Sequence, residues 1–218
     1  MAALSKHGKP APTARGPWLP GLDSPARIQD FLTRIPYDDA PGTISPRCVT
    51  SERKANCFEG ALFAAAALRR LGHPPQIVDL YAVNDDDHVV AVFRRKGAWG
   101  AVAKSNTTTL RYREPIYRTL RELVLSYFEG YFNVHGVKTL RSYSRPLDLR
   151  RFDRRQWMTT SEDLGYIGDH LNTMLHVPIV PAGLARTFRL ADRDQVRAGF
   201  LGSVRSGLYR AKRPGATR

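Results

Sequence analysis

The chain has 218 residues, of which 42% are hydrophobic and 25% are charged, so its composition is that of a globular protein. The longest uninterrupted apolar run, Ala61–Leu68, is far shorter than the ~20 residues of a membrane-spanning helix. Residues 1–14 lack the apolar stretch of a signal peptide, and two cysteines cannot form a disulfide framework. We therefore expect a cytoplasmic protein with no membrane partner.

A single domain is predicted between two tails. Residues 1–23 contain four prolines and little periodic apolar content, which predicts a flexible N-terminal arm. Ser24 followed by Pro25 predicts the start of a helix that ends before Pro36. The segment 38–46 is expected to be a loop. The domain would extend over residues 24–208, with its core at about 48–132, and residues 209–218 form a basic tail.

The strongest helix signal in the chain covers residues 57–71. Asn56 is a good N-cap residue, and Glu59 stands three positions later, where its side chain completes a capping box. Alanine and leucine then occupy nearly every face, which indicates a helix buried on most sides. Gly72 and two prolines end it.

Three strands are predicted next, over residues 76–83, 88–95 and 98–105, because these segments are rich in β-branched and apolar residues. Lys96-Gly97 fits a two-residue hairpin turn, which pairs Arg95 with Ala98. Pro115 is predicted to open an amphipathic helix. Two later helices are expected at about 161–176 and 192–208.

The basic excess lies mostly in the second half of the chain. The formal net charge of +14 divides into +4 for residues 1–110 (14 basic, 10 acidic) and +10 for residues 111–218 (20 basic, 10 acidic). Six arginines interleave with Tyr143, Phe152 and Trp157 in the segment 138–157, as on surfaces that bind nucleic acid. A solvated basic face is the alternative explanation.

Cys57 is the candidate nucleophile. It would lie in the first turn of its helix, where unpaired amide groups and the helix dipole favour the thiolate. A thiolate is the form of cysteine that attacks carbonyl carbons. The alternative is a small apolar side chain in a buried helix.

His88 is the candidate partner of Cys57, at the start of a predicted strand. Extending the hairpin register places His88 opposite Ser105 on the same face of the sheet. A slip of one residue would place Asn106 there instead. Either side chain could bind one ring nitrogen and leave the other for the thiol.

The order of these residues resembles the transglutaminase-like domain, a branch of the papain-like cysteine enzymes with a Cys, His, Asp catalytic order. The resemblance covers residues 48–106, with Asn56-Cys57-Phe58-Glu59-Gly60 on the helix and Asp87-His88-Val89 on the strand. It implies an α+β fold, in which the helix that begins at the cysteine packs on an antiparallel sheet and further helices follow. This chain offers Ser105 or Asn106 where the family has Asp.

The resemblance implies a cysteine enzyme that attacks an amide or acyl bond in an amide- or peptide-containing substrate. Hydrolysis is expected rather than transfer to an amine, because water needs no second binding site. No glycine-rich phosphate loop or zinc-site spacing occurs, so neither a cofactor nor a metal is expected. The alternative function is a catalytically inactive papain-like fold that binds nucleic acid or another polyanion through its arginine-rich half.

Overall fold

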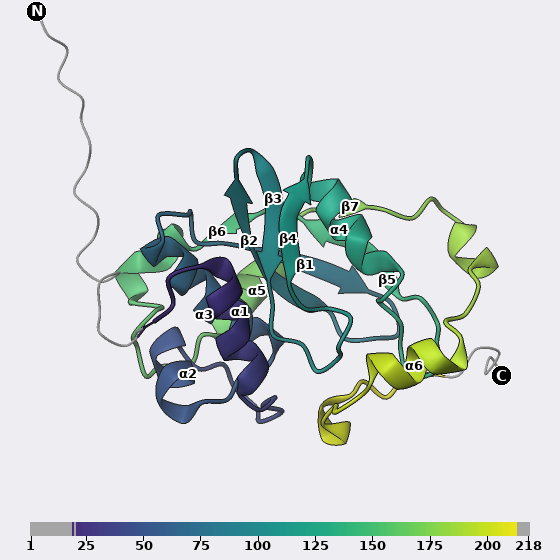
Figure 1. The fold of residues 1–218 in the computed structure, drawn as a ribbon, viewed down its shortest axis with the longest axis horizontal. Coiled ribbons are helices and arrows are strands. Elements are labelled where there is room, and N and C mark those ends of the chain that lie inside the picture. The colour runs from purple at the N-terminus through teal and green to yellow at the C-terminus, as the bar shows by residue number, and fades with distance from the viewer. Residues whose placement is uncertain (1–18, 20, 213–218) are drawn as a thin grey trace, which may run out of the picture.

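One antiparallel sheet organises the chain into an α+β fold (Figure 1). The computed structural model describes Leu19 and residues 21–212. The α-helices are α1 (Pro25–Arg34), α2 (Pro46–Glu52), α3 (Cys57–Arg70), α4 (Leu120–Phe128), α5 (Gly165–Asn172) and α6 (Arg193–Gly199). Three 3₁₀ helices are η2 (Leu149–Arg155), η3 (Leu184–Thr187) and η4 (Arg205–Gly207).

The sheet has seven strands, all paired antiparallel, in the order β4-β3-β2-β1-β5-β7, and the short β6 pairs with β1. Its strands are β1 (Gln76–Ala82), β2 (His88–Arg95), β3 (Ala98–Val102), β4 (Arg113–Tyr117), β5 (Leu140–Ser144), β6 (Leu147–Asp148) and β7 (His176–Pro178). The predicted hairpin is confirmed, because Arg95 pairs with Ala98 and Arg94 with Trp99.

Each face of the sheet is covered by helices, and strand alternation decides which residues meet them. On β2, Val89 and Ala91 pack in the cluster that includes α1, α3 and α5. Val90 and Val92 pack in the other cluster, which includes Leu123 of α4. Figure 1 shows α1 and α3 to the lower left of the sheet and α4 to its upper right.

Helix α3 begins at Cys57 as the sequence predicts, because both halves of the capping box form. The Asn56 side chain accepts a hydrogen bond from the Glu59 amide, and the Glu59 carboxylate accepts one from the Asn56 amide. Residues 59–68 are buried. At Gly60 a Cβ atom would collide with the side chain of Lys104, so glycine lets the helix start lie close to the chain that follows β3.

Two predicted elements differ from the structure near the edge of the sheet. Pro115 lies in β4 and not at a helix start, and α4 begins at Leu120 after the N-cap Thr119. A proline is tolerated in β4 because this is an edge strand, where a missing amide hydrogen costs little. The third strand ends at Val102 and does not reach Ser105.

Several other segments also differ from their predicted bounds. The segment 38–46, predicted as a loop, leads into α2, which the sequence did not indicate. The helices expected at 161–176 and 192–208 are shorter, at Gly165–Asn172 and Arg193–Gly199. Most of the predicted N-terminal arm lies outside the described residues, as do residues 213–218 of the tail. Among the described residues, no helix has both the length and the apolar character needed to cross a membrane.

Candidate active site

A small cavity with room for about 60 Å³ opens at the end of the sheet where β1 ends and β2 begins. Cys57 and His88 both line it, together with Tyr37 and Tyr131. Residues 207–209 form part of its wall. They belong to a segment that we call the C-terminal strap, Ser203–Lys212. The structure therefore brings the two central predicted residues to one cavity.

Cys57 is held as a neutral thiol in this cavity. Its Sγ atom lies 4.0 Å from the carbonyl oxygen of Asp87. Burial raises the pKa of Cys57 to about 11, although the amides of Val89 and Phe58 bond to the sulfur and lower it. The neighbouring Asp86 carboxylate raises it further. The helix N-terminus thus acts in the predicted direction, but burial outweighs it, and the predicted bias toward thiolate is absent from this state.

His88 belongs to the opposite face of the sheet from α3. It pairs with Leu80, whose side chain packs in the cluster with α4, and it is 4% exposed. Burial lowers the pKa of His88 to about 4, and the nearby Arg113 guanidinium adds to this effect. Both groups are therefore neutral near pH 7, and no hydrogen bond joins Cys57 to His88 in the part of the chain that the structure describes.

The tautomer of His88 follows from its hydrogen-bond partner. The Nε2 atom lies 2.8 Å from the carbonyl oxygen of Leu110, which can only accept, so Nε2 carries the hydrogen. In the neutral ring the Nδ1 atom then has a free lone pair. The Leu110 carbonyl fixes the imidazole in the way that we expected from Ser105 or Asn106.

Ser105 and Asn106 line the cavity, but their side chains have other partners. The Ser105 hydroxyl bonds with the Thr107 hydroxyl at 3.0 Å and accepts from the Thr107 amide. The Asn106 side chain binds the main chain of Val204 and Gly207. Because β3 ends at Val102, the extended register that would place Ser105 opposite His88 does not form. Neither residue orients His88 in this structure.

The sequence analysis did not predict two groups that contact the candidate site, the Leu110 carbonyl and Tyr37. The Leu110 carbonyl carries no side-chain signature, so no pattern could indicate it. Tyr37 lies after α1, and a bridge with Ala55 holds it next to the start of α3. The Tyr37 hydroxyl bonds to Cys57 and thereby lowers the pKa of the thiol, while burial raises the pKa of Tyr37 itself. Its position before the helix gave no sequence signal for this contact.

The pKa of His88 predicts how its replacement changes stability with pH. Between pH 6.5 and pH 4 the unfolded chain takes up a proton that the folded protein excludes, so this histidine destabilises the fold as pH falls. The full difference is about 3 kcal/mol. We expect His88→Gln to gain that amount relative to the wild type across this window, measured by urea unfolding at several pH values.

Comparing the two proteins separates the contribution of His88 to stability from that of groups whose pH dependence has the opposite sign. Burial raises the pKa values of Asp79 and Asp85 to about 6, so both carboxyls stabilise the fold as pH falls below 6. Their effect is the same in wild type and variant and cancels in the difference. A constant difference from pH 7 to pH 4 would contradict a buried neutral His88.

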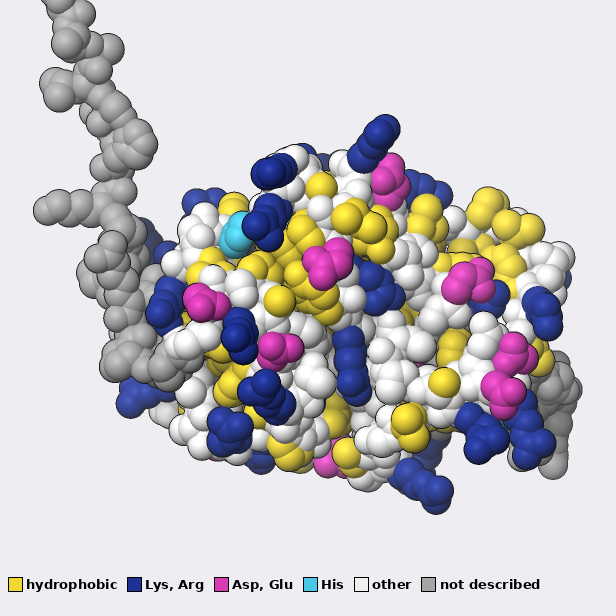
Figure 2. Space-filling model, viewed as in Figure 1, with side chains coloured by type: hydrophobic (Ala, Val, Ile, Leu, Met, Phe, Trp, Pro, Cys, Tyr) yellow, Lys and Arg dark blue, Asp and Glu magenta, His cyan; other side chains and the backbone are white. Residues whose placement is uncertain are grey.

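Part of the arginine-rich segment 138–157 is engaged with the protein itself, although most of its arginines are exposed. Arg150 bonds with Asp148, and Arg151 bonds with His170. Trp157 is fully buried and Tyr143 is 8% exposed, so these rings are not free to stack on bases. On the face drawn in Figure 2, Lys and Arg side chains are scattered among apolar and uncharged ones. No described contact favours the polyanion alternative over a solvated basic face.

Comparison with known proteins adds no functional constraint to this geometry. No protein-family model matches the chain, and no curated protein matches it.

Proposed function

We propose that this protein is a cysteine enzyme, similar in its core to the transglutaminase-like domain, which hydrolyses an amide or acyl bond. The observation that carries the proposal is the shared cavity of Cys57 and His88, in which the Nε2 hydrogen of His88 is held by Leu110. A buried cysteine with a purely structural role needs neither an amide-lined helix start nor a histidine with a fixed tautomer.

In the proposed reaction His88 acts as a general base. As the Cys57 sulfur bonds to the substrate carbonyl carbon, the thiol proton moves to Nδ1 of His88. The same proton then goes to the leaving amine as the carbon–nitrogen bond breaks, which leaves a thioester on Cys57. Water then attacks the thioester, gives its proton to Nδ1 and releases the acid, and Cys57 recovers its proton.

Charge on the substrate oxygen would be stabilised beside the sulfur. The main-chain amide of Cys57 stands at the start of α3, where it has no partner within the helix and bonds to the Tyr37 hydroxyl, which the substrate oxygen would replace. The Tyr37 hydroxyl already donates toward the sulfur and is a second candidate donor. A neutral thiol and imidazole need general-base assistance at the moment of attack, because only about one thiol in ten thousand is ionised near pH 7 at this pKa.

An activated ester tests this proposal without knowledge of the natural substrate. We expect p-nitrophenyl acetate to acetylate Cys57, with release of p-nitrophenolate. The rate should rise with pH as the imidazole of His88 loses its proton and becomes able to act as a base. Trypsin separates the two cysteines into the peptides 55–69 and 48–53, so mass spectrometry assigns the acetyl group. Cys48 is the internal control. Equal acetylation of both cysteines, unaffected by loss of His88, would refute the enzyme proposal.

A further inference from the structure

The Asn106 side chain forms hydrogen bonds with main-chain groups of the strap and not with its side chains. Its Oδ1 atom accepts from the Val204 amide at 2.8 Å, and its Nδ2 atom donates to the Val204 carbonyl at 2.9 Å. The same Nδ2 atom also donates to the Gly207 carbonyl at 3.0 Å. Val204 has extended backbone angles (φ −76°, ψ 114°), in which the amide and carbonyl of one residue point to the same side. Asn106 thus binds the strap as a neighbouring strand would.

Asn84 repeats this arrangement at the other end of the strap. Its Oδ1 atom accepts from the Lys212 amide at 2.8 Å, and its Nδ2 atom donates to the Lys212 carbonyl at 2.8 Å. Asn84 follows β1 and has a positive φ of 59°, a conformation that asparagine tolerates better than most residues. Two asparagines therefore each hold both polar groups of a single residue's main chain.

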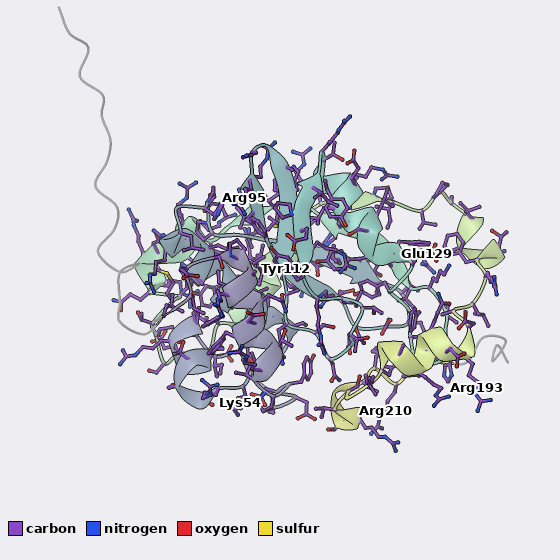
Figure 3. The ribbon with its side chains drawn as sticks, in the orientation of Figure 1. Lys54, Arg95, Tyr112, Glu129, Arg193 and Arg210 are labelled. Atoms are coloured by element: carbon purple, nitrogen blue, oxygen red, sulfur yellow. The ribbon has the colours of Figure 1, made fainter. Side chains whose placement is uncertain are left out.

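Between these two anchors the strap covers the candidate nucleophile. Gly207, Leu208 and Tyr209 line the cavity that contains Cys57, and they also line a second, wider and more open hollow that Cys57 borders. The fit is tightest at Gly207, where a Cβ atom would lie 3.0 Å from a ring carbon of Tyr37. Figure 3 shows Arg210, on the strap, and Lys54, which follows α2, along the same lower edge of the molecule.

We propose that Asn84 and Asn106 form a cradle for the main chain of a polypeptide substrate, and that the C-terminal strap occupies this cradle in the resting protein. The substrate class is polypeptide because the two asparagines bind amide and carbonyl groups that every residue except proline offers. The strap and the substrate then compete for the same bonds. The role assigned to Cys57 rests on the proposed function, whereas the cradle itself does not require catalysis.

Displacing the strap tests the first half of this proposal. In the full-length Gly207→Val variant the added side chain collides with Tyr37 and also crowds the Nδ2 atom of Asn106, which would lie 3.3 Å from the new Cβ atom, while both asparagines stay in the sequence. We expect iodoacetamide to alkylate Cys57 at least about tenfold faster than in wild type, because the covering hydrogen bonds are lost. Cys48 should react at an unchanged rate. Ser206→Val places the same side chain on the neighbouring exposed residue and should leave the Cys57 rate unchanged.

A second variant guards against a folding defect in the first. Asn84→Gly removes one anchor, and glycine adopts the positive φ at that position without strain. Lys96→Gly, at another positive φ in the distant hairpin, is its matched control. We expect faster alkylation of Cys57 in Asn84→Gly only. Wild-type alkylation rates in both Gly207→Val and Asn84→Gly, with unchanged circular dichroism, would overturn the covering role of the strap.

Synthetic peptides test the second half. A nonapeptide with the sequence of residues 204–212 is expected to protect Cys57 from alkylation in the Gly207→Val protein. A scrambled peptide of equal composition should protect at a concentration within about tenfold of that of the native peptide. The same peptide with N-methyl groups at the positions of Val204 and Lys212 should not protect. Equal protection by the N-methylated peptide would refute main-chain recognition. These outcomes are independent of acetylation by the ester, so a failed cradle and a failed enzyme proposal are distinguishable.

Discussion

Replacing His88 with glutamine is expected to slow the acetylation of Cys57 by p-nitrophenyl acetate by about 10²- to 10⁴-fold, the usual contribution of a positioned general base. Glutamine has a similar reach and keeps an N–H donor for the Leu110 carbonyl, but it has no basic nitrogen. The loss should therefore report proton transfer and not a rearranged cavity. Stopped-flow release of p-nitrophenolate measures the rate in both proteins.

The matched control for this prediction is Ser105→Ala. Ser105 also lines the cavity, but its hydroxyl bonds with Thr107 and not with His88. We expect this variant to acetylate Cys57 at close to the wild-type rate. A larger loss in Ser105→Ala than in His88→Gln would reverse the roles that we assign and would restore serine as the orienting residue.

The largest stability effect is expected at Trp157. Its indole is fully buried in the cluster with α1, α3 and α5, and its Nε1 atom donates to Asp153 at 3.1 Å. Asp153 in turn binds Arg69 of α3 through both carboxylate oxygens, at 2.7 and 2.8 Å. Trp157→Ala should lower the free energy of unfolding by about 3–5 kcal/mol, because it removes the largest buried side chain and leaves a cavity.

Trp157→Phe separates packing from hydrogen bonding at this position. Phenylalanine keeps an aromatic ring but loses the N–H donor, so we expect a cost of about 1–3 kcal/mol from the lost hydrogen bond to Asp153 and the smaller ring. Urea unfolding measured by circular dichroism provides both values. A cost below about 1 kcal/mol for Trp157→Ala would place this residue on the surface, where the sequence-based polyanion hypothesis had it.

The local elements were predictable because their signals lie within a few residues. The capping box of Asn56 and Glu59 fixes the first residue of α3, and the turn at Lys96-Gly97 fixes the β2–β3 register. The predicted helix forms as α4, but its predicted start at Pro115 was wrong, since the same proline fits an edge strand, and only the assembled sheet shows which strand is at the edge. Patterns of polarity along the chain do not contain this information.

The candidate site also combines features that the local sequence predicts with features that it does not. The amino-acid sequence alone predicts that Cys57 begins a buried helix and that His88 begins a strand two elements later, because capping and hydrophobic patterning are local properties. Folding of the whole chain brings His88 to the Leu110 carbonyl and Asn106 to the strap, about 100 residues farther along the chain. It also sets the charge state, since burial, which depends on every layer packed around the thiol, outweighs the helix N-terminus at Cys57.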